Sequence, residues 1–338
     1  MDQSQILYVT VLLQAGLLQQ VPTNVNLEQG NWDVILPYLA AQRLEGLAGQ
    51  GLAFLKSKDA ATVQPKVFAQ LGMNGIKDTM AYTRCSTDIT KFSRVWNAAG
   101  KQVLALGGLA LAPLYPSPNA RGGNELVCVP LYKKDATADE RDVKIESPFD
   151  FGSLRIVVPE TAAATADTKH RAAHDAVLNA AFASAPCTID ARQLTLRPNY
   201  MFWALYHLQL THSAAMSGQF TLISAIDWAM LLRRISAADT QFDWAAFRQQ
   251  AAALGVTRFA TSLTTLAVRL TGIQLPADAL GDTDDKGADL LLASTFATTG
   301  SAAASGVKGF VEVLRNHDFY AHNSDGSVIG RAFSKLFA

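Results

Sequence analysis

The chain has 338 residues, of which 49% are hydrophobic, so it can bury one large core or two ordinary ones. Its 29 Lys and Arg residues balance its 29 Asp and Glu residues. Bulk charge therefore gives no reason to expect non-specific binding to nucleic acid or to a membrane surface.

The N-terminal run from Ile6 to Leu18 is apolar, but it lacks a basic start and is shorter than the ~20 residues of a membrane span. We interpret residues 3–20 as an amphipathic helix, and we expect a cytoplasmic chain without membrane contact. The cysteines, Cys85, Cys128 and Cys187, are widely spaced and form no zinc or redox pattern. They are typical of core residues in a reducing compartment.

Apolar residues recur with helical spacing over most of the first hundred residues. The spacing predicts a helix over 32–56, with Asn31 as its N-cap, and a long helix over 65–99 that ends at Gly100. Residues 1–100 are therefore predicted to be an N-terminal helical region.

The next segment, Lys101 to Leu131, reads KQVLALGGLALAPLYPSPNARGGNELVCVPL. It predicts a strand, a tight turn at Gly107 and Gly108, a short helix, a loop containing Arg121, and a strand from Glu125. Backbone N–H groups at a helix start favour an anion, so this layout is compatible with a phosphate. The glycines match neither standard nucleotide-binding motif, and a plain turn remains the simpler interpretation.

Residues 143–151 and 154–158 are predicted to form two strands around a turn, which gives a sheet of about four strands over residues 101–160. Residues 161–338 are predicted to be helical. The expected helices are 165–182, 198–216, 220–235, 243–254 with Asp243 as N-cap, and 256–271. Residues 281–287 and 298–306 are interpreted as flexible breaks. The fold class predicted is α+β, a small mixed sheet flanked by helices.

Several histidines invite a metal or catalytic interpretation. His170 and His174 are four residues apart on a predicted helix, a spacing that can bind zinc, but no third ligand accompanies them and a solvated pair is favoured. His207 and His212 are five apart, do not converge on one helix face, and are interpreted as packed residues. The aromatic residues of this region are interpreted as core, namely Trp203, Tyr206, Trp228, Trp244 and Phe247.

Two carboxylates at positions i and i+2 of a strand point to one face and can share divalent metals that hold a triphosphate. In the strand from Glu125 the second position is Val127, so one carboxylate is present. Glu146 and Asp150 could supply a further acid from the following hairpin. The sequence does not fix their register to Glu125.

The stretch from Ala105 to Val129 resembles the signature of the bacterial uncharacterised nucleotidyltransferase family, a branch of the polymerase-beta-like superfamily. Residues 31–47, 196–232 and 242–271 resemble its helical regions, so the resemblance covers roughly residues 30–275. It implies a nucleotidyltransferase fold, with Gly107, Gly108 and Arg121 as nucleotide-binding positions. It also implies magnesium as the cofactor if the chain is active.

The match at the family's metal-binding acids is incomplete. Glu125 falls on the first metal-binding Asp, Val127 on the second, and Arg155 near the third, while Gly107 stands where the family has Lys.

Three functions remain open. The first is a catalytically degenerate protein of this fold, a pseudoenzyme that binds a nucleotide or a protein partner. The second is an active magnesium-dependent nucleotidyltransferase that moves a nucleoside monophosphate group using Glu125 with Glu146 or Asp150. The third is an unrelated helical scaffold that shares only the architecture.

Overall fold

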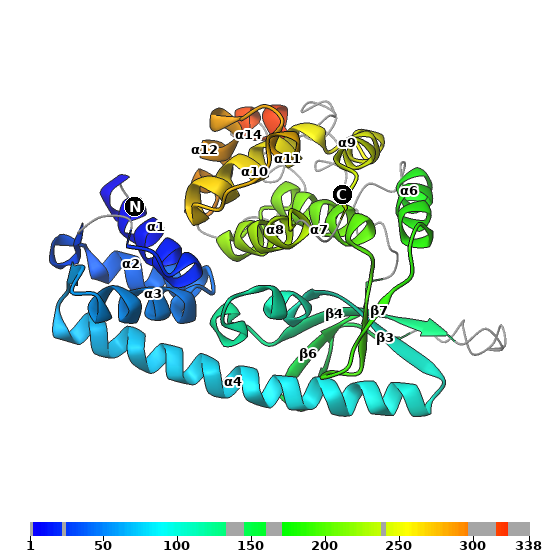
Figure 1. Ribbon diagram of the computed structural model, residues 1–338, viewed down its shortest axis with the longest axis horizontal. Coiled ribbons are helices and arrows are strands. Elements are labelled where there is room, and N and C mark those ends of the chain that lie inside the picture. Colours follow the sequence, from blue (N-terminus) through cyan, green and yellow to red (C-terminus); the bar gives the residue numbers. More distant parts are fainter. Residues whose placement is uncertain are drawn as a thin grey trace, which may run out of the picture. The chain divides into compact units, whose positions relative to one another are not determined.

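The computed structural model describes residues 3–21, 25–132, 145–159, 171–237, 241–296 and 316–323. It confirms an α+β fold (Figure 1). The chain divides into two compact units, which we describe separately. Unit 1 comprises Met1–Thr161 and Phe182–Asn199, and unit 2 comprises Ala162–Ala181 and Tyr200–Ala338. His170 and the predicted break at 298–306 lie outside the described residues.

Unit 1 begins with helices that pack on one another. They are α1 (Gln3–Leu18), α2 (Trp32–Ala41), α3 (Glu45–Ser57) and the long α4 (Pro65–Ala98). The short 3-10 helix η1 (Leu27–Gln29) precedes α2, and β1 (Val25–Asn26) pairs in parallel with β2 (Ala61–Thr62). Helix α3 packs on both α1 and α4.

The predicted helices of this region are confirmed with three differences. Consecutive side chains of α1, at residues 11 to 13, are buried, so the helix is not amphipathic. The single helix expected over 32–56 is two helices, because Arg43 between them has a left-handed φ of 58°. Asn31 occupies the N-cap of α2, but its side chain makes no capping hydrogen bond.

Six strands form the main sheet in the order β5-β6-β4-β3-β8-β7. Their bounds are β3 Lys101–Gly108, β4 Glu125–Tyr132, β5 Phe149–Phe151, β6 Leu154–Val157, β7 Thr188–Asp190 and β8 Thr195–Arg197. The pairs β3/β4, β5/β6 and β7/β8 are antiparallel, whereas β4/β6 and β3/β8 are parallel. The sheet has two strands more than expected, because β7 and β8 are too short to give a sequence pattern.

The connection between β3 and β4 also differs from the prediction. Strand β3 runs through Gly107 and Gly108, which pair with Val127 and Leu126 of β4, so this glycine pair is not a turn. Two 3-10 helices follow, η2 (Leu109–Leu114) and η3 (Pro118–Arg121), in place of the expected helix and loop. Pro113 inside η2 is incompatible with a regular α-helix at that point.

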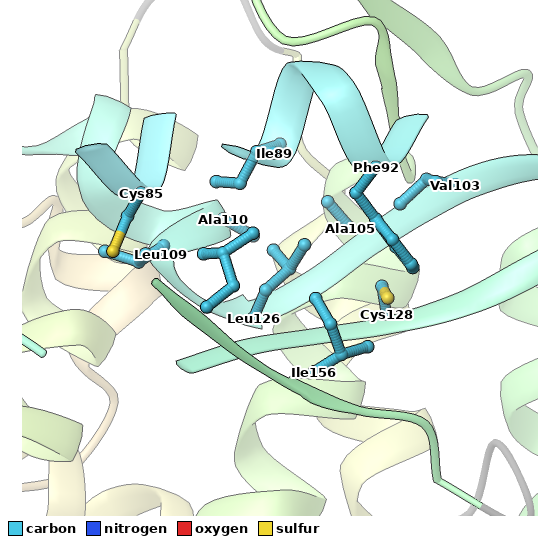
Figure 2. Close-up of a cluster of buried hydrophobic side chains, with 11 residues drawn as sticks. Cys85, Ile89, Phe92, Val103, Ala105, Leu109, Ala110, Leu126, Cys128 and Ile156 are labelled. Carbon is cyan, nitrogen blue, oxygen red and sulfur yellow. The ribbon is translucent and has the colours of Figure 1, made fainter. Parts of the chain in front are cut away.

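One face of the sheet packs against α4 (Figure 1). Figure 2 shows the buried cluster between them, in which Ile89 and Phe92 of α4 lie over Leu126, Cys128 and Ile156 of the strands. Burial raises the pKa of the Cys128 thiol to about 12. Since side chains alternate along a strand, the residues between these apolar ones project from the other face.

Unit 2 is helical in the part of the chain that is described. Its helices are α6 (Arg171–Ala183, whose last two residues belong to unit 1), α7 (Tyr200–Met216), α8 (Leu222–Ile235), α9 (Trp244–Ala253), α10 (Thr257–Thr271), α11 (Ala277–Leu280), α12 (Asp285–Ser294) and α14 (His317–Asn323). Helix α10 packs on α8, α12 and α14. As predicted, Asp243 caps α9, because its carboxylate accepts a hydrogen bond from the Ala246 N–H at 2.9 Å.

The expectation of a flexible break over residues 281–287 is wrong. Asp284 is the N-cap of α12 and accepts a hydrogen bond from the Gly287 N–H at 3.0 Å. Gly287 is buried, and a Cβ there would collide with the side chains of Ser262 and Asp284. The run of Asp and Gly residues thus begins a helix.

The packed histidines and core aromatics are confirmed. His207 is 4% exposed and its ring stacks on Trp228 at 6.0 Å between centroids. The Nε2 atom of His212 lies 3.1 Å from the Asn323 carbonyl oxygen. His174, expected to be one of a solvated pair, is instead half-buried and contacts the buried Gln209, with 3.3 Å between its Nδ1 and the amide Nε2.

Candidate functional site

The candidate site lies where β4 begins, on the sheet face opposite α4. Glu125 of β4 is in register with Arg155 of β6, and Arg155 is in register with Asp150 of β5. Paired residues of neighbouring strands point to the same face, so the three side chains form one row in the order acid, arginine, acid. We call Glu125, Arg155 and Asp150 the strand row.

The strand row is open to solvent to different degrees. Glu125 is half-buried, whereas Arg155 and Asp150 are exposed. Strands lie about 4.8 Å apart, so two strand spacings, about 10 Å, separate Glu125 from Asp150 at the backbone. Arg155 stands between them, in the place that the resemblance gives to a third acid. Glu146 is exposed and lies three residues before β5, outside the strand row.

Val127 of β4 and the two glycines of β3 lie beside the strand row, in the two central strands of the sheet. The Val127 side chain is 5% exposed, so the position that would carry the second acid is filled by buried hydrocarbon. Gly108 has a φ of 63°, and a Cβ there would collide with the Glu125 carbonyl oxygen. Gly108 therefore serves the close approach of β3 to β4, and η2 is too short to offer a helix N-terminus for phosphate.

A second group of side chains surrounds the loop that leads into β4. Arg121, at the end of η3, is 5% exposed and donates from Nη1 to the Gly122 carbonyl oxygen at 3.2 Å. A Cβ at Gly123 would lie 3.8 Å from Arg121 Nη1 and 3.6 Å from Arg43 Nη1. Both arginine side chains thus lie near Gly123, two residues before Glu125.

Two carboxyl groups lie near the same loop, since a Cβ at Gly122 would lie 3.9 Å from Asp78 Oδ2 and Asp78 interacts with Glu45. Burial raises the pKa of Asp78 to about 6, the negative charge of Glu45 adds to the increase, and a hydrogen bond from the Gly46 N–H opposes it. Burial also raises the pKa of Glu45, whose Oε1 accepts a hydrogen bond from the Asn74 amide at 2.5 Å. We call Arg43, Arg121, Asp78 and Glu45 the loop cluster.

No protein-family model, curated protein or solved structure matches this chain. The site must therefore be interpreted from its own residues. Among the described residues, no helix is both long enough and apolar enough to span a membrane. Within the same ranges, no three His, Cys, Asp or Glu side chains come together as metal ligands.

The residues present do not fit a pair of magnesium ions. A two-metal site holds its ions about 3.5–4 Å apart, with carboxylates bridging or flanking them. Glu125 has no second acid on its own strand, and its nearest in-register neighbour is a cation. We therefore derive no catalytic step through magnesium.

The structure brings some of the predicted site residues together and adds others. Glu125, Asp150, Gly107, Gly108 and Arg121 gather at one end of β3, β4 and the β5–β6 hairpin.

The structure also adds residues of the loop cluster that sequence reasoning missed. Arg43 lies inside the helix predicted over 32–56, and Asp78 is one of several charges on the helix predicted over 65–99. Neither position carries a local motif, so only the tertiary packing reveals them.

Proposed function

We propose that this protein has a nucleotidyltransferase-like fold, has lost nucleotidyl transfer, and acts by binding a nucleotide or a protein partner. The observation that carries the proposal is the strand row, in which Arg155 lies between Glu125 and Asp150, where the resemblance leads us to expect an acid. The buried Val127 removes the second acid. With the two-metal clamp absent, several kcal/mol of charge stabilisation is lost, and each 1.36 kcal/mol costs tenfold in rate.

The arginines near the start of β4 favour a nucleotide over a protein as the bound partner, because a nucleotide carries phosphate groups. A guanidinium can hold phosphate oxygens through two parallel hydrogen bonds and needs no metal to do so. Arg43 is exposed beside the loop before β4, and Arg155 is exposed on the strand beside Glu125. This arrangement supports phosphate binding at the position where the family resemblance places metal-bound phosphates.

The alternative is an active magnesium-dependent nucleotidyltransferase that uses Glu125 with Asp150 or Glu146. One observation favours it, because Asp150 shares the strand row and its face with Glu125. Against it stand the separation of about 10 Å between these positions and the cation between them. The two functions differ in whether a nucleotide becomes covalently transferred.

The two functions are distinguished by incubating the protein with α-labelled ATP, GTP, CTP and UTP, with magnesium or manganese, in the presence of cell extract. We expect no protein-dependent label on any acceptor, for wild type and Glu125→Gln alike. Transfer of label by the wild-type protein that Glu125→Gln abolishes would establish the active alternative. Asp150→Asn and Glu146→Gln, made in parallel, would then identify the second acid.

A further inference from the structure

Unit 2 contains an open cavity of about 500 Å³ beside the start of α10. This volume lies within the range of about 300–1,000 Å³ that is typical of small-molecule sites. The first turns of α10, the residues before α12, and α14 meet there. Helices α10, α12 and α14 pack on one another and lie side by side in Figure 1. The lining of the cavity consists of Thr257, Arg258, Thr261, Asp282, Thr283, Asp284 and His322. We call it the α10 cavity.

Two of its four ionisable side chains satisfy each other. The Nε2 atom of His322 lies 2.6 Å from Asp284 Oδ2, which also accepts a hydrogen bond from the Ser262 hydroxyl at 2.6 Å. Burial of the Asp284 carboxyl disfavours its charged form and by itself would raise its pKa. The hydrogen bonds from Ser262, Gly287 and His322 outweigh burial and hold the pKa of Asp284 below its ordinary value. The Asp284 carboxylate therefore links α10, α12 and α14 through these hydrogen bonds.

The other two, Arg258 and Asp282, are not committed to another charge. Arg258 donates from Nη1 to the Ala321 carbonyl oxygen at 3.3 Å, a neutral partner that leaves its charge and most of its N–H groups available. Asp282 is exposed. In the described ranges, neither side chain has an ion-pair partner within 4.0 Å. The cavity thus offers one available cation and one available anion.

The rest of the lining is hydroxylic. The Thr261 hydroxyl donates to the Thr257 carbonyl oxygen at 3.2 Å, which leaves its oxygen as an acceptor. The hydroxyls of Thr257 and Thr283 make no hydrogen bond within the described part of the chain. Among the described residues that line it, none has a large apolar side chain. A fatty or aromatic ligand would gain little here, whereas a small polar ligand could satisfy these groups.

We propose that the α10 cavity binds a small zwitterion of the free amino-acid class. Its α-carboxylate pairs with the Arg258 guanidinium, a geometry that can be bidentate. Its α-ammonium pairs with the Asp282 carboxylate, and the threonine hydroxyls contact its side chain. A ligand with one charge of each sign can pair with both Arg258 and Asp282, whereas a simple anion or cation can pair with only one of them. This site lies in unit 2 and does not depend on the function proposed for unit 1.

The test is ligand-observed NMR followed by calorimetry on the full-length protein. The probes are the individual L-amino acids, their N-acetyl and carboxamide derivatives, and inorganic phosphate. We expect at least one free amino acid to bind, and expect loss of either charge to weaken binding about tenfold or more. The proposal is wrong if no free amino acid binds at about 10 mM. Equal binding of the N-acetyl derivative or of phosphate would also overturn it.

A matched pair of variants assigns binding to this cavity. Asp282→Asn removes the proposed partner of the ammonium, whereas Asp285→Asn makes the same change at an exposed residue that does not line the cavity. We expect about a tenfold or greater loss of affinity for the first variant and none for the second. Arg258→Gln should weaken binding similarly, with folding checked by circular dichroism. If Asp282→Asn and Arg258→Gln fold and bind like wild type, the assignment is refuted.

Discussion

Arg155 lies beside Glu125 on one strand and beside Asp150 on the other, with its guanidinium on the same face as both carboxylates. A cation in this row repels a divalent metal that approaches either carboxylate. The same cation can contact a phosphate directly. One residue thus changes which kind of ligand this end of the sheet can hold.

Asp78 provides a test of the loop cluster at the level of a single side chain. Its pKa in the folded protein is about 6, above the ordinary value of 3.8, so folding favours its protonated form. The protonated Asp78 carboxyl therefore contributes favourably to the free energy of unfolding below pH 3.8, and this contribution is lost as the pH rises through about 6. We predict that Asp78→Asn stabilises the protein above that pH by about 1 kcal/mol, a value reduced for the partial exposure of the carboxyl.

The measurement is the unfolding midpoint of wild type and Asp78→Asn across this pH range. The advantage of the variant should shrink as the pH falls toward 4. Asp150→Asn, at an exposed residue of the same type, is the control and should show no comparable trend. A constant difference between Asp78→Asn and wild type at every pH would contradict the assigned burial effect.

At the residue level, the sequence identifies the positions that matter but not their neighbours. Glu125, Val127 and Arg155 are singled out by their place in the pattern, and the structure puts Glu125 and Arg155 in register. Arg43 and Asp78 could not be found in this way. They meet Gly122 and Gly123 through packing between segments about 40 to 80 residues apart along the chain, which no local spacing encodes.

Among the elements, the packing of α3 on its neighbours depends on glycine. Gly51 of α3 faces Leu12 of α1, and a Cβ at Gly51 would collide with the Leu12 carbonyl oxygen. A backbone atom cannot move aside as a flexible side chain can. The two helices can therefore approach this closely only because position 51 has no side chain.

We predict opposite outcomes for alanine at two helical glycines. Gly51→Ala should lower the free energy of unfolding by about 1–3 kcal/mol, or more, because α1 and α3 must separate. Gly72→Ala in α4, where nothing lies within 4 Å of an added Cβ, should raise it by about 0.5–1 kcal/mol. Urea denaturation of both variants provides the measurement. If Gly51→Ala is as stable as Gly72→Ala, then α1 and α3 do not approach each other as closely at Gly51 as described here.

Long elements with a clear period are predictable here, and short or glycine-rich ones are not. The 34-residue helix α4 and the N-cap Asp243 follow from apolar spacing and capping chemistry. The glycine pair at 107 and 108 predicts a turn but lies within β3, and Gly108, which a close strand contact requires, looks the same in sequence as a turn glycine. Asp284 was misinterpreted as part of a loop, because its three hydrogen-bond donors come partly from α10 and α14.

At the scale of the whole molecule, the mixed sheet defines the fold of unit 1, and the strand row places two acids and an arginine on one face of that sheet. Strand β3 is antiparallel to β4, and β4 is parallel to β6, with the strand row at the end where β4 and β6 begin. The α+β class follows from the sequence, since strand-like segments occur in one central stretch between helical regions. Because the division into two units rests on contacts between distant segments, the sequence does not show that residues 182–199 join the sheet unit.

The central claim is that the site binds without metal-dependent chemistry, and the most direct test is calorimetric titration of ATP, GTP, CTP and UTP in magnesium and in EDTA. We predict that at least one nucleotide binds with the same affinity in both, within about threefold. Arg43→Gln should weaken it by about tenfold and Glu125→Gln should leave it unchanged. Binding that magnesium strengthens tenfold or more, and that Glu125→Gln abolishes, would contradict the claim and establish a working metal site.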